Sequence, residues 1–163
     1  MESLLNLQEE TNLFNKIKNS FAIYGIYIVY AFIIYHIIEA FIPCSNIASQ
    51  VFNIPPFSKP TYSETFFRIC IVAPITEEIF FRVCPIMILT ILGLKNNIIL
   101  PCVVLISCFF GYEHSGSISI LAQGVFGLLL SWNYIVNRSI FLNILTHFLW
   151  NFSLLSIFPY LIK

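Results

Sequence analysis

The sequence predicts an all-α integral membrane protein with about five packed transmembrane helices. Of its 163 residues, 58% are hydrophobic and only 10% are charged, and the mean hydropathy is +0.86. A soluble domain is nearer half apolar and a quarter charged, so this composition cannot cover a soluble surface. Long apolar runs alternate with short polar connections, as in helices that cross a bilayer. The net charge is zero and no basic patch is present, so no nucleic-acid partner is expected.

The chain begins with a polar arm and a first span. Residues 1–19 lack the early apolar core of a cleavable signal peptide. They are expected to form either a helix in the membrane interface or a frayed cytoplasmic tail. Residues 20–42 are long enough, at about 1.5 Å per residue, to cross about 30 Å of hydrocarbon, and Pro43 ends this helix. His36 and Glu39 lie near that end, where both side chains are expected to reach the interface.

A proline-rich connector and a proline-containing span follow. Residues 43–64 form the longest connector, and a short interfacial turn is expected near Ile47–Phe52. A loop of this length is a candidate to lie over a site opening. The next span, from about Thr65 to Leu92, contains Pro74, which is expected to kink or break the helix. Broken helices at membrane depth are tolerated where they line a cavity inside the protein.

Three further spans complete a single membrane domain over residues 1–163. They are expected at about 98–114, 118–136 and 140–162, with short polar turns between them. The positive-inside rule places the N-terminus in the cytoplasm, because more Lys and Arg residues fall on its side of the membrane. The basic residues on that side are Lys16, Lys18, Lys95 and Arg138. Lys59 and Lys163 are expected on the opposite side, and Arg68 lies near that opposite membrane edge.

The stretch Ala73–Arg82 places two adjacent carboxylates and a guanidinium in an apolar span. A charge at the centre of a bilayer helix costs about 2.5–3.5 kcal/mol, which something must offset. Glu78 and Arg82 are four residues apart with the acid first, the favoured order for a helical ion pair. Glu77 projects about 100° away and is left to face a cavity, where a carboxylate suits general base and then general acid catalysis. An Arg–Glu cluster that only locks helices together is the structural alternative.

Two other spans each carry a histidine with a partner one helical turn away. Phe110 shares a helix face with His114, and His147 shares one with Asn151. His147 and Asn151 can both donate hydrogen bonds toward one point, as an oxyanion requires. The alternatives are an interfacial, solvated His114 and a polar pair that glues helices together. Because three apolar helices carry polar groups of complementary types, a single site formed by all three helices is favoured.

The motifs of other intramembrane proteases are absent. The sequence contains no His-Glu-x-x-His of a zinc protease, no Gly-x-Ser-Gly of a serine type and no Gly-x-Gly-Asp of an aspartyl type. A glutamate–histidine site that activates water remains.

Taken together, the three motifs resemble those of the CAAX prenyl endopeptidase and bacteriocin-processing (CPBP, or Abi) intramembrane proteases. The resemblance covers about residues 65–155, which would form the catalytic core. Glu-Glu-x-x-x-Arg, Phe-x-x-x-His and His-x-x-x-Asn all occur, in that order and at helical spacings. The matching residues are Ala73, Pro74, Glu77, Glu78, Phe81 and Arg82, then Phe110 and His114, then Gly124, Gly127 and Trp132, and finally His147 and Asn151.

The resemblance implies packed transmembrane helices that enclose a polar cavity. It implies that Glu77 and His114 hold and activate a water molecule. It further implies that His147 and Asn151 form the oxyanion site. No metal and no other cofactor are expected, although zinc held by the glutamate and the two histidines is chemically possible.

The resemblance also implies supporting residues, and the sequence departs from the family pattern in places. Arg82 would position the acid pair, with Glu78 secondary and Phe110 beside the first histidine. Val83 stands where the family usually has glycine. The chain is shorter than the prenyl endopeptidases and is closer in size to the compact bacterial members, so a prenylated CAAX substrate is not the first expectation.

The predicted function is intramembrane hydrolysis of a peptide bond by a multi-pass protein of the cell membrane. Its partners would be the lipid bilayer and a membrane-associated peptide or protein, such as a leader peptide, a bacteriocin precursor or a tethered regulator. A non-catalytic membrane immunity or scaffold protein of the same fold is the alternative. A proton-coupled carrier is less favoured, because no inverted repeat is visible.

Overall fold

The computed structural model describes residues 13–42, 51–52 and 62–156, and within these ranges all regular structure is helical. Three helices are long and apolar enough to cross a membrane: α1, α6 and the helix from Ser117 to Asn137. The predicted all-α membrane fold is therefore confirmed. The elements are α1 (Leu13–Phe41), α3 (Tyr62–Phe66), η2 (Phe67–Val72), α4 (Ala73–Glu78), η3 (Ile79–Val83), α5 (Cys84–Ile91), α6 (Asn96–Ser115), α7 (Ser117–Ser119), η4 (Ile120–Gly124), α8 (Val125–Asn137) and α9 (Ile140–Ser156).

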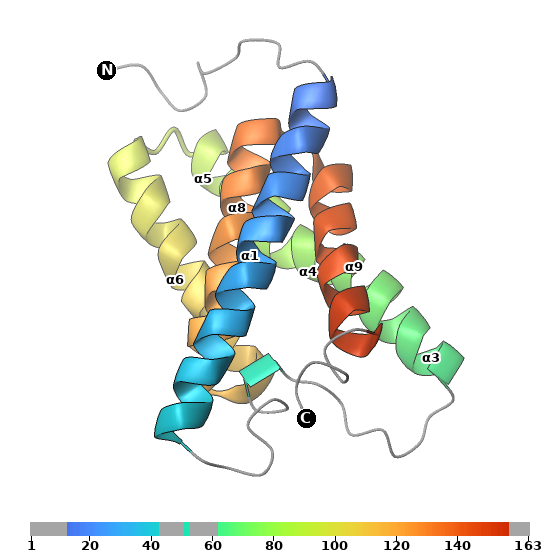
Figure 1. The fold of residues 1–163 in the computed structure, drawn as a ribbon. Helices are drawn as coiled ribbons and strands as arrows, with labels where there is room; N and C mark the ends of the chain where they lie inside the picture. The colour runs from blue at the N-terminus through green and yellow to red at the C-terminus, as the bar shows by residue number, and fades with distance from the viewer. Residues whose placement is uncertain (1–12, 43–50, 53–61, 157–163) are drawn as a thin grey trace.

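Successive helices run in alternating directions, so that their connections collect at two ends of the bundle (Figure 1). The start of α1, the turn before α6 and the turn before α9 lie at one end. Lys16, Lys95 and Arg138 are therefore grouped at the same end, as the sequence predicts.

The turn after α6 depends on a glycine. Gly116 has φ +73°, which lets the chain reverse directly after His114 and Ser115.

Helix α1 starts earlier than expected. Residues 13–19, assigned to the N-terminal arm, form its first turns, while residues 1–12 lie outside the described ranges. No proline or glycine interrupts this stretch, and Ser20 is already buried. The arm and the first span are therefore one helix from Leu13 onward.

The segment from Tyr62 to Ile91 runs obliquely across the bundle and stays helical throughout (Figure 1). A π-helical stretch, η2, precedes Pro74, and a second one, η3, precedes Pro85. In a π-helix each N–H donates five residues back, so the stretch absorbs the loss of a proline N–H without ending the helix. The predicted interruption at Pro74 is thus a π-helical distortion in place of a break.

Large aromatic side chains fill the interior beside the site. The rings of Tyr27 and Phe126 stack with centroids 4.5 Å apart, and Trp150 meets Tyr27 edge-on at 4.4 Å. All three side chains are fully buried. Many equally apolar side chains, among them Phe80, Leu105 and Phe141, remain exposed on the outside. An exterior as apolar as the core fits a protein surrounded by lipid.

Two residues of the long connector pack in the core. Val51 and Phe52 are buried, and their carbonyl groups accept hydrogen bonds from Ser119 Oγ at 3.2 Å and Gln123 Nε2 at 3.0 Å. The described part of the predicted turn at Ile47–Phe52 is therefore internal and not interfacial, because polar side chains of α7 and η4 bind its backbone. The rest of the connector, and the loop predicted to lie over the site, fall outside the described residues.

A cavity of about 390 Å³ lies between α6 and α8 and is lined by aliphatic side chains and Trp132. It contains none of the predicted site residues. The polar groups instead gather where α4, α6 and α9 approach one another. The cavity is lined by Leu100, Val103, Val104, Leu128, Leu129, Trp132 and Ile135.

Candidate active site

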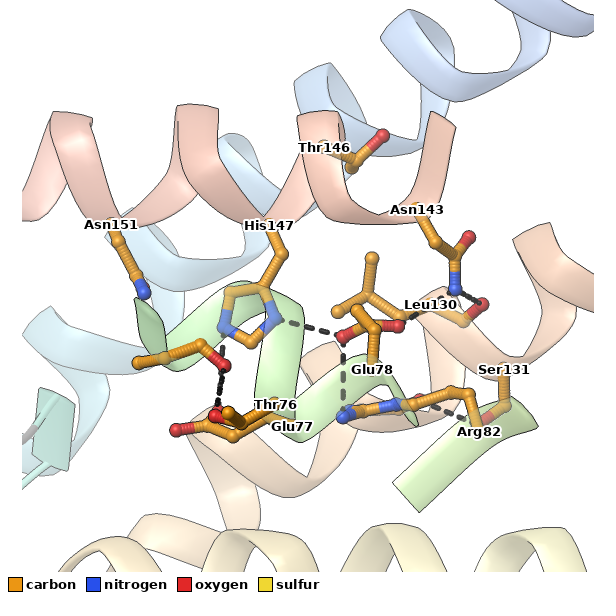
Figure 2. Close-up of polar contacts among 12 residues, drawn as sticks. Thr76, Glu77, Glu78, Arg82, Leu130, Ser131, Asn143, Thr146, His147 and Asn151 are labelled. Carbon is orange, nitrogen blue, oxygen red and sulfur yellow. Dashed lines mark hydrogen bonds and ion pairs between the residues drawn. The ribbon is translucent and has the colours of Figure 1, made fainter. Parts of the chain in front are cut away.

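The two neighbouring acids of α4 leave the helix toward different sides of the His147 ring (Figure 2). Glu78 is completely buried, and its Oε1 lies 2.8 Å from His147 Nδ1 and 3.3 Å from Arg82 Nη1. Its Oε2 accepts a hydrogen bond of 2.8 Å from Asn143 Nδ2. Both oxygens are thus occupied by donors, which offsets the cost of burying the charge. The predicted Glu78–Arg82 ion pair is present.

Arg82 is held in a slot that a glycine leaves open. Its guanidinium carbon lies 4.0 Å from the centroid of the Phe110 ring, which is a cation–π arrangement. A Cβ atom on Gly127 would lie 2.8 Å from Arg82 Nη2 and 3.0 Å from Phe110 Cδ1. An added methyl group at residue 127 would therefore displace the guanidinium or the Phe110 ring, so Gly127 leaves the space in which Arg82 packs between α6 and α8. Phe110, predicted as a supporting residue, supports the arginine as well as His114.

His147 stands between the two acids. Its Nδ1 faces Glu78, and its Nε2 lies 3.6 Å from Glu77 Oε2. A carboxylate that already pairs with Arg82 acts as an acceptor, so His147 Nδ1 carries the hydrogen. The ring is also fixed by packing, with Phe126 edge-on at 5.2 Å. One edge of His147 is thus used by Glu78, and the other is presented to Glu77.

His114 approaches Glu77 from α6. Its Nδ1 lies 2.7 Å from the Phe110 carbonyl, and its Nε2 lies 3.8 Å from Glu77 Oε2. Because a carbonyl can only accept, Nδ1 of His114 carries the hydrogen, and in the neutral ring Nε2 presents a lone pair. Close packing of α6 on η4 sets this approach, since a Cβ on Gly111 would lie 2.5 Å from the backbone nitrogen of Gly124.

Glu77 is less enclosed than its neighbour Glu78. Its side chain is 24% exposed, against 0% for Glu78. Glu77 Oε2 is nevertheless buried and has no hydrogen-bond partner among the described residues. Distances of 3.6 and 3.8 Å to two histidine nitrogens exceed a direct hydrogen bond, and a bridging water suits such a gap. The structure therefore brings Glu77, His114 and His147 together around one point.

Asn151 lies one turn beyond His147 and is tied to the distorted helix. Its Nδ2 donates to the Ile69 carbonyl at 2.8 Å. In this π-helical stretch the Ala73 N–H donates to the carbonyl of Arg68, five residues earlier. By the same pattern, the Ile69 carbonyl would accept a hydrogen bond from the N–H of residue 74. Residue 74 is proline and has no N–H, so Asn151 provides the hydrogen bond instead. Asn151 is predicted from the sequence to form the oxyanion site, and its contact with Ile69 appears only in the structure.

Two residues that shape the site, Asn143 and Gly127, were not predicted from the sequence. Asn143 contacts Glu78, and Gly127 makes room for Arg82. A signal for Asn143 was available, because Asn143, His147 and Asn151 recur every four residues on one face of α9. No comparable signal marked Gly127 as a neighbour of the arginine, which lies on another helix.

The donor set near Glu77 is the one that zinc would also accept, namely one carboxylate and two imidazoles. Within the described residues, however, no group of three or more His, Cys, Asp or Glu side chains has the arrangement of a metal site. His147 is already oriented by Glu78, and His114 by the Phe110 carbonyl, so both rings present Nε2 without any ion.

The fold and the site define a class: an all-α membrane protein with a carboxylate–histidine cluster in its interior. A family model described as "Type II CAAX prenyl endopeptidase Rce1-like" matches residues 60–153, more than half of the chain. The chain belongs to this Rce1-like family, whose general activity is that of a protease. The resemblance to the CPBP proteases is thereby confirmed. Neither curated proteins nor solved structures gave a match.

Proposed function

We propose that the protein is an intramembrane endopeptidase that hydrolyses a peptide bond in a membrane-associated peptide or protein. The observation that carries the proposal is the convergence of Glu77 Oε2 with Nε2 of His114 and His147, at 3.8 and 3.6 Å. A water molecule bound there would meet one carboxylate acceptor and the His114 lone pair. The family match supports proteolysis in general, and the site supports this particular assignment of residues.

In the proposed reaction, Glu77 is the general base. It takes a proton from the water, whose oxygen attacks the carbonyl carbon of the scissile bond. His114 Nε2 accepts the second hydrogen of the water and so directs the oxygen. When the carbon–nitrogen bond breaks, Glu77 returns its proton to the leaving amine. Every atom of the water ends in the two products, and the carboxylate is regenerated.

The oxyanion would form toward α9. Asn151 has two Nδ2 hydrogens, of which one is used by the Ile69 carbonyl, so the other is available to an oxyanion. When protonated, His147 would donate from Nε2 while Nδ1 remains on Glu78. The cluster would then hold two carboxylates and two cations and carry no net charge, which suits a low-dielectric interior. Arg82 and Glu78 would position His147 without touching the substrate.

No metal takes part in the proposed reaction. Glu77, His114 and His147 are nevertheless the residues that would hold a zinc ion, which would supply Lewis-acid activation of the same water.

We further propose that the chain is a multi-pass protein of the cell membrane with the Lys16 end in the cytoplasm. The proposed partners are the bilayer and the peptide substrate.

Cleavage by the purified protein in proteoliposomes tests the proposal. The probes are a farnesylated peptide with a CAAX end, its unprenylated counterpart and membrane peptides extracted from the host cells. Glu77→Gln is compared with the wild type and with Glu64→Gln, which makes the same change at an exposed position of α3. We expect the wild type and Glu64→Gln to cleave one probe and Glu77→Gln to leave all of them intact.

The outcomes separate the candidate functions. Equal cleavage by Glu77→Gln and the wild type would remove Glu77 from the reaction. If no probe is cut, and Glu77→Gln complements a deletion strain as well as the wild type does, a scaffold or immunity role replaces catalysis. Loss of cleavage with a zinc chelator, and its recovery with added zinc, would replace the metal-free mechanism. Preference for the farnesylated probe would indicate a prenylated substrate.

A further inference from the structure

Four buried polar side chains that the proposed reaction does not use form a continuous line from α1 to Glu78. They come from α1, α8 and α9, and none is more than 4% exposed. We call them the amide ladder: Ser20, Asn137, Asn133 and Asn143. Apolar residues at these positions would avoid the cost of burying amides away from water, so the ladder calls for a function.

The hydrogen bonds of the ladder all point the same way. Asn137 Nδ2 donates to Asn133 Oδ1 at 2.6 Å, and Ser20 Oγ donates to the same oxygen at 3.2 Å. Asn133 Nδ2 donates to Asn143 Oδ1 at 2.8 Å. Asn143 Nδ2 donates to Glu78 Oε2 at 2.8 Å. Each step therefore directs a donor toward Glu78, and aligned hydrogen bonds of this kind polarise and strengthen one another.

The orientation of the Asn143 amide is fixed by its neighbours. Its Nδ2 meets Glu78 Oε2 and the Leu130 carbonyl, both at 2.8 Å. The carbonyl is an acceptor, and Glu78 acts as one beside Arg82, so the nitrogen and not the oxygen must face them. The oxygen then faces Asn133, which donates to it. All three hydrogen bonds of the amide are made, and rotation of the amide would lose them together.

We propose that Asn143 is a positioning residue of the active site, held in place by the rest of the ladder. By occupying Glu78 Oε2, Asn143 leaves Oε1 to His147 and keeps Glu78 a hydrogen-bond acceptor. His147 therefore keeps its hydrogen on Nδ1 and presents Nε2 to the point where the water and the oxyanion meet. Ser20 lies outside the family-matched residues 60–153, so α1 joins the site through this ladder. The inference rests on the proposed peptidase function.

The test compares three variants of the purified protein on the cleaved probe. Asn143→Leu removes the donor, and Asn143→Asp keeps the shape but donates only when protonated. Thr146→Val is the matched control, since Thr146 is buried in α9 beside His147 and its hydroxyl donates to the Leu142 carbonyl of its own helix, its one hydrogen bond within the described part of the chain. We expect Asn143→Leu to lower kcat about 10- to 100-fold with KM within about twofold, and Thr146→Val to change neither.

Two readouts distinguish positioning from simple packing. The kcat of Asn143→Asp, taken as a ratio to the wild type, should rise as the pH is lowered, because the protonated acid regains a donor. In ¹⁵N NMR of histidine-labelled protein, Asn143→Leu should alter the His147 tautomer signals, which a His147→Gln variant assigns.

Each outcome bears on one proposal. Unchanged kcat and unchanged His147 signals in a folded Asn143→Leu variant would overturn the positioning role. Equal losses in Asn143→Leu and Thr146→Val would do the same. If the wild type cuts no probe, the peptidase proposal fails, while the NMR signals still decide whether Asn143 orients His147.

Discussion

Glu77 and Glu78 are neighbours in the chain, yet their surroundings are opposite. The Glu78 cluster, consisting of Glu78, Arg82, Asn143 and His147, is closed, and the carboxylate has three donors within 3.3 Å. The Glu77 face, consisting of Glu77 and His114, is partly open: His114 Nε2 lies 3.8 Å from the carboxylate, and Nε2 of His147, from the Glu78 cluster, lies 3.6 Å from it. A saturated carboxylate orients other groups, whereas an under-coordinated one is free to bind water and move a proton. The proposed function therefore gives these adjacent identical residues different roles, one structural and one chemical.

The sharpest test of this contrast is Glu77→Gln. We expect kcat to fall about 10²- to 10⁴-fold, as for the loss of a general base, with no loss of thermal stability. Stability should be kept because Glu77 Oε2 has no hydrogen-bond partner among the described residues. Kinetics and thermal unfolding in detergent are measured on the same preparation. A large drop in Tm would show that Glu77 is structural and would break the contrast.

Glu78→Gln, in contrast, should lower stability as well as activity. Removing one partner of a buried ion pair leaves Arg82 uncompensated, which costs about 3–5 kcal/mol of unfolding free energy. A double variant with leucine at both positions 78 and 82 should recover much of the stability but no activity, since His147 loses its acceptor. Denaturant unfolding of the single and the double variant measures their unfolding free energies for this comparison. Full activity in Glu78→Gln would contradict the orienting role.

Asn151→Ala tests two roles of one side chain, because Asn151 is proposed to donate to the oxyanion and also donates to the Ile69 carbonyl. We expect kcat to fall about 10²- to 10³-fold from loss of an oxyanion donor. Stability should fall by about 1 kcal/mol from loss of the Ile69 hydrogen bond. Adding Pro74→Ala restores an N–H near Ile69 and should recover the stability alone. Recovery of kcat as well would mean that Asn151 acts on the helix and not on the substrate.

Gly127→Ala tests how tightly the Glu78 cluster is enclosed. The added Cβ would lie 2.8 Å from Arg82 Nη2, so we expect a loss of about 1–3 kcal/mol in unfolding free energy. Gly25→Ala is the control: nothing lies within 4 Å of its added Cβ, and alanine should stabilise α1 by about 0.5–1 kcal/mol. Similar effects of the two changes on the unfolding midpoint would argue against a glycine-dependent slot for Arg82.

Much of the site was predictable because helical spacing relates residues within one element. Glu78 and Arg82, Phe110 and His114, and His147 and Asn151 are each four apart, and each pair lies on a shared helix face as expected. Spacing says nothing of contacts between helices. That Glu78 is the acid next to His147 Nδ1, and that Asn151 binds Ile69, depends on how α9 packs against η2 and α4.

The sequence by itself determined that the chain is an apolar, all-helical membrane protein with two acids, an arginine and two histidines at helical spacings. Composition and periodicity suffice for this, because they fix solvent preference and the relative directions of side chains on one helix. The tertiary structure alone decided which acid is saturated and which stays open. It did so through π-helical stretches before Pro74 and Pro85, a glycine slot at Gly127 and asparagine amides from α8 and α9. These features depend on distances between elements, which no local pattern encodes.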